Sequence, residues 1–407
     1  MNSKPLSILS VNKFFWRKGG SEAVFFAEKE LLESRGHRVV PFSMAHPKNE
    51  PSEYAEHFVS QVDYETPGLG NKLSSALKVL YSMEARRKID SLLNGFTPDV
   101  AHLHVFQHQI SPSILGPLKK RGIPVVYTLH DLKPVCPTYR CFLDGVVCEA
   151  CSGRRFYNCT LKKCTKGSLS KSIVNTAEMY LHHWLGYYEQ IDHYIAVSRF
   201  YREMMIREGF PADKLSHVPN CVDSSAFPLS DSDDGYVLYF GRLSDEKGVD
   251  LLVDCARMAP EIQFVIAGTG PSSMALRNAA AGLDNFNMVG HKSGSELTDL
   301  IGRCALTTLP TRWFENCPMS VLESLAMGKP VVGARIGGVP ELISEGRDGY
   351  CFVPGSADDC VGKMKKLLEL SATSRSAMGR KGREKLENEF SAESHYERLM
   401  SIYRSLI

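Results

Sequence analysis

Residues 312–343, RWFENCPMSVLESLAMGKPVVGARIGGVPELI, contain the pattern that decides the fold. Pro318 is well placed as the first residue of an apolar helix, with Asn316 or Cys317 as its cap. The β-rich run PVVGAR, residues 330–335, follows that helix. A helix followed by a short apolar strand is the repeating unit of parallel α/β sheets.

The same alternation of strand and helix patterns runs through the whole chain. Strands are predicted at 6–11, 37–42, 99–104, 123–130 and 191–198, and then at 236–243, 262–270, 286–291, 305–310 and 330–335. A helix is predicted from about Ser21 to Ser34, ending at Gly36. The predicted fold class is α/β, with two Rossmann-like, doubly wound domains that face each other across a cleft. Such sheets bind ligands at the carboxyl ends of their strands, so we expect the active site in that cleft.

The length of 407 residues suits two domains of about 200 residues each. We predict a first domain over residues 1–215, with a cysteine-rich insertion at 136–165, and a second domain over 216–391. The sequence SDSDDG, residues 230–235, is predicted to be a linker. The final amphipathic helix, residues 392–407, is expected to pack back toward the first domain.

Composition and charge narrow the classes of function. The chain is 43% hydrophobic and 23% charged, and no apolar run approaches the ~20 residues of a membrane span. Residues 1–200 hold 25 Lys and Arg against 18 Asp and Glu, a net charge of +7, whereas the remainder carries −5. We expect a cytoplasmic protein without a signal peptide. Its basic first half is interpreted as a peripheral contact with the inner face of the membrane, as a contact with a phosphate-bearing acceptor, or as a solvated face without a partner.

Two glutamates, Glu315 and Glu323, stand eight positions apart around the start of the predicted helix. Glu323 lies too far into the helix to complement its dipole, and its neighbours one turn away are apolar: Met319, Ala326 and Met327. A carboxylate on such a face is costly unless it is hydrogen-bonded, and the vicinal diol of a ribose would satisfy it. Glu315 would bind a hexose in the same way. The alternative is that Glu323 is a boundary residue of an amphipathic helix.

A phosphate site is predicted in YFGRLSDEKGVDLL, residues 239–252. Arg242 follows a strand, and Lys247 precedes a helix expected to begin near Gly248. Two cations together with free helix N–H groups suit a diphosphate. The alternative is a surface loop whose cations pair with Asp245 and Glu246.

Glycines on both sides of the cleft are candidates for ligand contact. Gly19 and Gly20 would let the backbone approach a ligand at the start of the first helix. The dinucleotide fingerprint G-x-G-x-x-G is absent there, and GTGPSS, which begins at Gly268, lacks its third glycine. This disfavours a nicotinamide or flavin enzyme.

These motifs resemble a known family. ENCPMSVLE, residues 315–323, resembles the E-x7-E element of retaining glycosyltransferases with the GT-B fold, specifically the family four group, also called glycosyl transferases group 1. GRLSDEKGVDLL, AGTGP, HVPNCVD and GGVPELI are similar to its other recurring blocks. In the first half the similarity rests on KGGSE and YTLHD.

The resemblance implies a role for each candidate residue. Glu323 would bind the ribose, Glu315 and the backbone after it the transferred sugar, and Arg242 with Lys247 the diphosphate. His130, which ends a strand in YTLHD, resembles the residue that contacts the donor sugar near the reacting carbon, with a structural hydrogen bond as the alternative. The other donor-binding candidates are Gly19, Gly20, Gly268, Asn316, Cys317 and Pro318.

The chemistry implied is a hexosyltransferase reaction that retains anomeric configuration. Fixed cations at the phosphates would stabilise the charge that develops on the leaving diphosphate, so no metal cofactor is expected for catalysis. The D-x-D pattern of metal-dependent glycosyltransferases occurs only at Asp231 to Asp233, inside the predicted linker. The expected partners are a nucleotide-diphosphate-sugar donor and a glycan or lipid-linked acceptor, in polysaccharide or glycolipid assembly.

Six of the twelve cysteines lie between residues 136 and 164. Cys148, Cys151, Cys159 and Cys164 would supply four thiolates to a structural zinc ion. The alternative is a set of free thiols in a mobile loop, since their spacing departs from common zinc-ribbon patterns. The insertion follows YTLHD directly, so we expect it to overhang the cleft on the acceptor side.

Two functions of other classes compete with the glycosyltransferase. A zinc-stabilised nucleic-acid-binding protein is suggested by the cysteines and by the nearby cations Arg154, Arg155, Lys162, Lys163 and Lys166, but it leaves the second half unexplained. A nicotinamide-dependent oxidoreductase is disfavoured by the missing fingerprint. We therefore expect no nucleic-acid partner.

Overall fold

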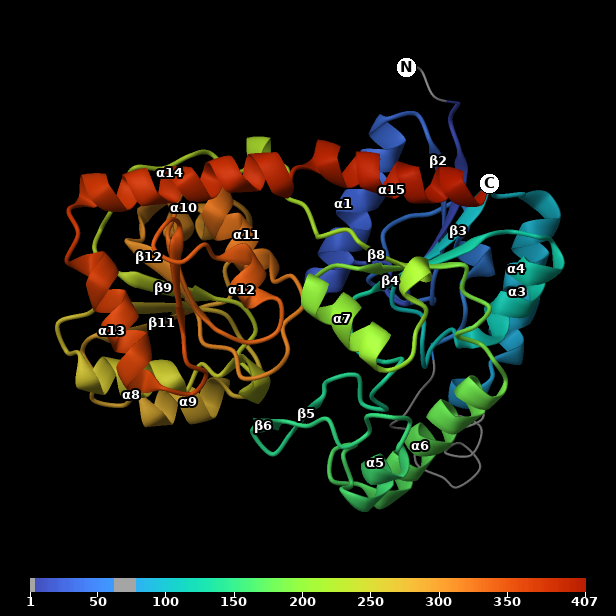
Figure 1. The fold of residues 1–407 in the computed structure, drawn as a ribbon, viewed down its shortest axis with the longest axis horizontal. Helices are drawn as coiled ribbons and strands as arrows, with labels where there is room; N and C mark the ends of the chain where they lie inside the picture. Colours follow the sequence, from blue (N-terminus) through green and yellow to red (C-terminus); the bar gives the residue numbers. More distant parts are fainter. Residues whose placement is uncertain (1–3, 62–77) are drawn as a thin grey trace.

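The computed structural model describes residues 4–61 and 78–407. It contains two six-stranded parallel sheets (Figure 1). The first, in the order β2-β1-β3-β4-β7-β8, comprises β1 Ser7–Val11, β2 Arg38–Phe42, β3 Val100–Leu103, β4 Val125–Leu129, β7 His193–Ala196 and β8 Leu215–His217. The second, in the order β11-β10-β9-β12-β13-β14, comprises β9 Val237–Phe240, β10 Phe264–Ala267, β11 Phe286–Gly290, β12 Leu306–Leu309, β13 Val331–Ala334 and β14 Gly349–Phe352.

The predicted fold class is confirmed, and all ten predicted strands are present. Within the two six-stranded sheets, the sequence analysis missed two strands, β8 and β14, which each form one edge of their sheet. β8 has only three residues, two of which, Ser216 and His217, are polar, and β14 begins with a glycine, so neither was recognised from its pattern. The predicted boundary at 215/216 falls inside β8, and we place it after His217 instead.

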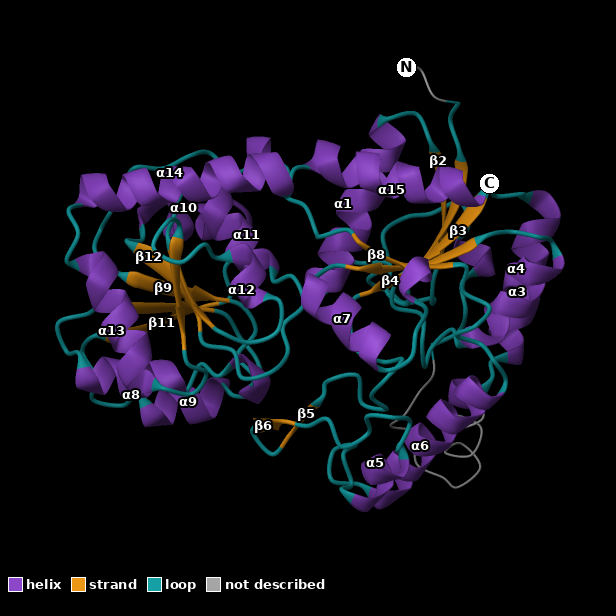
Figure 2. Ribbon diagram, viewed as in Figure 1, coloured by secondary structure: helices purple, strands orange, loops and turns teal. Residues whose placement is uncertain are grey.

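Helices cover both faces of each sheet (Figure 2). Around the first sheet lie α1 Gly20–Ser34, α3 Met83–Gly95, α4 Leu115–Lys120 and α7 Arg199–Arg207. Around the second lie α8 Leu251–Met258, α9 Ser273–Ala279, α10 Gly294–Arg303, α11 Met319–Ala326, α12 Val339–Leu342 and α13 Ala357–Leu368. The predicted first helix is confirmed within one residue, and Gly36 beyond its end has a φ of +83°, which favours glycine.

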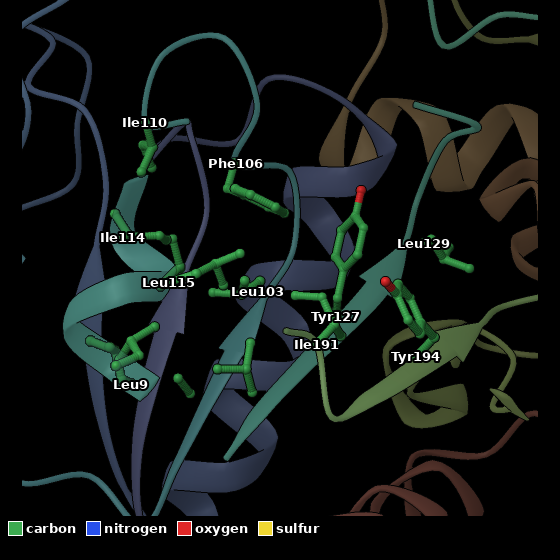
Figure 3. Close-up of a cluster of buried hydrophobic side chains, with 14 of the residues drawn as sticks. Leu9, Leu103, Phe106, Ile110, Ile114, Leu115, Tyr127, Leu129, Ile191 and Tyr194 are labelled. Carbon is green, nitrogen blue, oxygen red and sulfur yellow. The ribbon is translucent and has the colours of Figure 1, made fainter. Parts of the chain in front are cut away.

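The core of the first domain fixes the strand that leads into the predicted site. Leu103 on β3, Tyr127 on β4 and Tyr194 on β7 are neighbours across the sheet and almost fully buried (Figure 3). Each such side chain stabilises the fold by about 1.5–3 kcal/mol through removal of apolar surface from water. The end of β4 is therefore held rigidly.

The segment predicted to be a linker is tied to the second domain. Asp231 pairs with Arg380 at 2.8 Å, and Asp233 pairs with Arg375 at 2.6 Å. Asp234 pairs with Arg303. The prediction of a free linker at 230–235 is therefore wrong, because these carboxylates hold the segment against the second domain. The chain crosses between the sheets earlier, after β8.

The C-terminal helices span both domains. In Figure 1, α14 Ala372–Glu389 runs along the second domain, and α15 Ala392–Leu406 continues over the first. The Tyr396 hydroxyl hydrogen-bonds to His37 at 2.8 Å, and the Tyr403 hydroxyl to His102 at 2.7 Å. The last helix thus packs on the first domain.

The cysteine-rich insertion forms a small outlying unit. It contains the hairpin β5 Phe142–Leu143 with β6 Val146–Val147, followed by α5 Tyr157–Leu161 and α6 Leu169–Trp184. A fully buried ion pair between Lys133 and Glu178, at 2.7 Å, ties α6 to the loop after β4. Lys133 also donates to the carbonyl of Pro137 at 2.9 Å.

Candidate active site

Two loops at the carboxyl ends of β9 and β12 are joined to form one surface. Gly248 has a φ of +63°, and a Cβ there would lie 2.2 Å from the carbonyl oxygen of Pro310. The backbone N–H of Arg312 donates to the carbonyl of Glu246 at 2.9 Å, and the Thr311 hydroxyl donates to the same carbonyl at 3.1 Å. The helix expected to begin near Gly248 instead begins at Leu251, because a 3-10 turn precedes this left-handed glycine.

The joined loops bring Lys247 and Glu315 into contact. The Lys247 ammonium lies 2.6 Å from Oε1 of Glu315, which also accepts from the Thr311 hydroxyl at 3.1 Å. The ammonium stands 5.4 Å from the ring centre of Trp313. Glu315 is buried, so the ammonium stabilises its charge. The predicted alternative, a pairing of the loop cations with Asp245 and Glu246, is wrong for Lys247.

Arg242 is exposed, and its guanidinium forms no hydrogen bond or ion pair within residues 4–61 and 78–407. Its positive charge lowers the pKa of Lys18, which burial lowers more strongly. Lys18 comes from the opposite domain, directly before Gly19 and Gly20. The two domains therefore direct cations toward each other across the cleft. The sequence analysis did not single out Lys18, although its motif KGGSE was noted.

The predicted glycines have different roles. Gly268 has a φ of +159°, and a Cβ there would lie 1.9 Å from the carbonyl oxygen of Gly241, so Gly268 lets its loop pack against the Arg242 loop. Gly19 is extended, and a Cβ at Gly20 would meet open space. Neither Gly19 nor Gly20 is required by the protein's own packing, which leaves room there for a ligand.

Glu323 lies in α11 and is half-buried. Its carboxylate forms no hydrogen bond or ion pair with any residue of the described chain. Burial raises the pKa of Glu323 to about 7. This half-buried carboxylate is open to hydrogen-bond donors from a ligand, which would offset the cost of its partial burial.

The residues between the two glutamates hold the domains together. The Asn316 amide donates to the carbonyl of Leu129 at 2.6 Å and accepts from the Ser198 hydroxyl at 2.8 Å. The Cys317 carbonyl accepts from the Asn220 side chain at 2.9 Å. The side chain of Asn316, predicted to bind the donor, is thus engaged by the first domain. Pro318 precedes the helix as its cap residue instead of opening it, because its ψ of 121° is extended.

His130 follows β4 and belongs to a buried chain of polar side chains. Its Nε2 lies 2.9 Å from Nδ1 of His104, and Nε2 of His104 lies 3.4 Å from the Glu28 carboxylate. Burial lowers the pKa of His104 to about 4 and holds the pKa of His130 well below its usual range. Both imidazoles are therefore neutral at pH 7. Glu28 and His104 were missed because they lie far from His130 in sequence, although the alternation in AHLH places His102 and His104 on one face of a strand.

One group of side chains in the described chain offers three metal-ligand atoms within 4.8 Å of one another: Glu28, His102 and His104. Its shortest contact, 2.7 Å between His102 Nδ1 and Glu28, is a hydrogen-bond distance. His102 also contacts the hydroxyls of Thr128 and Tyr403, both at 2.7 Å. These contacts hold His102 in place, whereas Nε2 of His104 has no hydrogen-bond partner in the described chain.

The four thiols predicted as zinc ligands are not brought around one point among the described residues. The Cys159 thiol instead hydrogen-bonds to Cys164, which lowers the pKa of Cys159 to about 7. Cys136 and Cys141 form a second such pair, which lowers the pKa of Cys136 to about 6. The zinc site stays a prediction.

The insertion reaches the loop that carries Arg242 and Lys247. Arg140 contacts Asp245 at 3.0 Å and Glu246 at 2.9 Å, across the cleft. The sequence analysis missed this contact, because partners 105 residues apart leave no local pattern. It joins the insertion of the first domain to a loop of the second domain.

Two protein-family models match the chain, one over each half. The model of Glycosyltransferase Family 4 matches residues 18–226, and that of Glycosyl transferases group 1 matches residues 223–385. A 42.6 kDa protein from the cps region of Klebsiella pneumoniae is 24% identical, over 83% of this chain and 87% of its own. The Arabidopsis thaliana sulfoquinovosyl transferase is 33% identical over 37% of this chain, and the match spans only 30% of that relative.

Solved structures share the fold. Sucrose-phosphate synthase from Thermosynechococcus elongatus has a TM-score of 0.74 at 17% identity, covering 98% of this chain and 99% of the other. The Anabaena protein HepE, solved in complex with UDP and glucose, has a TM-score of 0.66 at 16% identity, covering 98% and 100%. Neither of the two competing functions, nucleic-acid binding or nicotinamide-dependent oxidation, is favoured by these matches.

Proposed function

The chain belongs to the family 4 glycosyltransferases, and from this premise we propose that it transfers a sugar from a nucleotide-diphosphate-sugar to a glycan or lipid-linked acceptor, with retention of anomeric configuration. One observation carries the proposal. The half-buried Glu323 carboxylate has no partner in the described chain and lies eight positions after Glu315, which contacts Lys247. A ribose diol at Glu323 and a diphosphate at Lys247 together describe such a donor.

In this proposal the donor lies along the carboxyl ends of the second sheet. Glu323 accepts hydrogen bonds from the ribose hydroxyls. Arg242 and Lys247 bind the diphosphate, with Lys18 facing them from the first domain. The phosphate oxygens then share the Lys247 ammonium with Glu315, which turns toward the sugar hydroxyls.

The same cations account for catalysis. Breaking the anomeric C–O bond places negative charge on the leaving diphosphate, and preorganised cations stabilise that charge more in the transition state than in the ground state. The reaction then requires no metal cofactor. The only D-x-D carboxylates, Asp231 and Asp233, are occupied by Arg380 and Arg375.

His130 contacts the sugar as a neutral imidazole. Its Nε2 is bound to His104, so its other ring nitrogen is the one left for a sugar hydroxyl. A neutral ring does not oppose the positive charge that develops on the sugar ring. Retention follows if the acceptor hydroxyl attacks on the face that the diphosphate leaves, with the leaving phosphate taking its proton.

The acceptor is proposed to approach from the side of the first domain and its insertion. No helix of the described residues is long and apolar enough to span a bilayer. A lipid-linked acceptor would therefore bring the protein to the cytoplasmic face of the membrane as a peripheral protein.

A panel of UDP-, GDP-, ADP- and dTDP-sugars tests the function without knowledge of the acceptor. Slow hydrolysis of one donor is expected, and Arg242→Ala should abolish it. The matched control is Arg257→Ala, an exposed arginine on α8 that pairs with Asp254. Hydrolysis that persists in Arg242→Ala, or the absence of both binding and hydrolysis for every donor, would contradict the proposal.

A further inference from the structure

The amphipathicity of α6 is inverted. Four residues of the helix are fully buried, and only Met179 among them is apolar, whereas Ser172, Glu178 and His182 are polar. Glu178 Oε2 pairs with Lys133 at 2.7 Å, and His182 Nε2 lies 2.9 Å from the carbonyl of Leu80, whereas Glu178 Oε1 and His182 Nδ1 have no hydrogen-bond partner among the described residues. The polar face of α6 therefore packs on the protein.

The opposite face of α6 is apolar and exposed. Its exposed residues recur every three or four positions and so form one stripe along the helix: Leu169, Ile173, Ala177, Tyr180 and Trp184. Trp184 is 81% exposed, and the large apolar residues Leu169, Ile173 and Tyr180 are 42–49% exposed. Such a stripe normally faces a core.

The neighbouring helix α5 extends this surface. The backbone N–H of Tyr157 lies 3.3 Å from the Tyr180 hydroxyl, so the two helices lie side by side. Leu161 on α5 is 71% exposed, and Tyr157 is 49% exposed. We call these seven residues of α5 and α6 the apolar surface. Soluble proteins rarely expose contiguous apolar patches of this kind without a binding function.

Cations are concentrated in the segment of the chain that forms the apolar surface. Residues 150–177 contain six Lys and Arg and no Asp or Glu: Arg154, Arg155, Lys162, Lys163, Lys166 and Lys171. None of the six forms an ion pair with a described residue. A surface with Trp, Tyr and Leu bordered by unpaired lysines has the chemistry of a bilayer interface, where aromatic rings lie at the headgroup level and lysines reach anionic headgroups.

We propose that the apolar surface of α5 and α6 docks on a bilayer that contains anionic phospholipid. A second copy of this chain fits less well, because a two-fold contact would place six unpaired cations against six others. Figure 1 shows α5 and α6 projecting from the first domain on the side away from α15, next to the β5–β6 hairpin. Docking there would present the insertion, and through Arg140 the donor loop, to lipid-linked molecules. The lipid-linked acceptor rests on the proposed function, whereas the docking itself does not.

Co-sedimentation of the full chain with vesicles tests the proposal. Binding is expected to vesicles that contain phosphatidylglycerol, to weaken as salt rises, and to be at least about tenfold weaker for pure phosphatidylcholine. The double variant Ile173→Ser/Trp184→Ser should lose about tenfold or more in affinity, and so should Lys162→Glu/Lys163→Glu/Lys166→Glu. The matched controls are Met274→Ser, 73% exposed on α9, and Lys381→Glu, exposed on α14.

Two further measurements, donor hydrolysis and sedimentation velocity, distinguish membrane docking from loss of enzyme function and from dimerisation. Donor hydrolysis should continue at the wild-type rate in all these variants. If the wild type binds vesicles but hydrolyses no donor, the docking proposal stands and only the proposed enzyme function is contradicted. Sedimentation velocity without vesicles should show a monomer. The proposal would be overturned by equal binding of the wild type and the stripe variant, or by a dimer that the stripe variant dissociates.

Discussion

Glu323 and its raised pKa make the donor site sensitive to pH. A carboxyl group whose pKa is about 7 in the folded protein, against 4.5 in an unfolded chain, binds a proton on folding between those two pH values. Folding is therefore favoured by this group at low pH, and the advantage is lost as pH rises through 7. A ribose diol, in contrast, is bound best by the ionised form.

Glu323→Gln tests both consequences. The variant should be more stable toward urea than the wild type at pH 8, with a difference that vanishes near pH 4.5. Donor affinity in the wild type should rise as pH increases through about 7, whereas the variant should bind weakly with no such dependence. A variant that is less stable at pH 8 yet binds nucleotide normally would make Glu323 a structural residue.

Substitution of Arg242 and of Lys247 should have the same effect on turnover but different effects on the stability of the fold. Both substitutions to Ala should lower turnover about 10²-fold or more, as expected for a preorganised charge at the leaving group. Only Lys247→Ala should also destabilise the fold, by about 1–3 kcal/mol, because it leaves the buried Glu315 without its cation. Turnover assays and urea denaturation measure the two effects separately. Unchanged turnover in either variant would refute the diphosphate assignment.

Among the individual helices and strands, the sequence predicted those whose local pattern of apolar residues is clear. The apolar runs of ten strands were sufficient, whereas β8 has only three residues, two of them polar, and β14 begins with a glycine. The start of α8 was placed three residues early because Gly248 was interpreted as a helix start, when its left-handed backbone ends a 3-10 turn. The two glutamates of the E-x7-E element were predictable. The contacts of His130 with His104 and of His104 with Glu28 were not, because they form only when α1, β3 and β4 pack together.

A buried ion pair is one of the contacts that attach α6 to the first domain. Lys133 and Glu178 are 1% and 0% exposed, so Lys133→Ala should cost about 3–5 kcal/mol by leaving a buried charge uncompensated. The double variant Lys133→Met/Glu178→Leu should recover most of that loss. Urea denaturation of the two single variants and the double variant gives the coupling. Additive losses would show that the two side chains act independently.

The zinc site predicted in the cysteine-rich insertion can be tested by metal analysis. If zinc binds, the purified chain should carry about one metal ion, and Cys151→Ser should lose it while nucleotide affinity is kept, since the donor groups lie mainly in the second domain. Cys221→Ser is a matched control outside the insertion. If metal analysis finds no zinc and all six thiols react freely, the zinc site is refuted. The two hydrogen-bonded thiol pairs would then be the contacts that organise these cysteines.

At the scale of the whole molecule, α15 joins the two ends of the chain around one buried network. His395 on this helix lies 2.9 Å from the carbonyl of Pro219, in the segment that crosses between the domains, and 3.4 Å from Glu28. Glu28 in turn faces His102 and His104. The last helix, the crossing segment and the loop of His130 are therefore one connected polar structure, which no local pattern in the sequence reveals.

Buried neutral histidines should make the whole fold labile to acid. Burial lowers the pKa of His104 and of His217 to about 4 and that of His108 to about 3, against 6.5 for an exposed histidine. The unfolded chain takes up these protons below pH 6.5, whereas the folded protein does not until near pH 4. Stability is thus fully present above pH 6.5 and falls as pH drops toward 4, with a slope of up to ~1.4 kcal/mol per pH unit for each histidine.

Urea denaturation between pH 8 and 4.5 measures this slope, and His108→Asn is the variant that isolates one part of it. His108 has a φ of +69°, a left-handed conformation that Asn tolerates, so the substitution removes the titrating ring with little backbone strain. The charged groups around the ring, Glu178, Lys133 and Lys13, remain. The variant should lose about 1.4 kcal/mol per pH unit of the slope between pH 6 and 4.5. An unchanged slope would mean that His108 titrates normally in the folded protein.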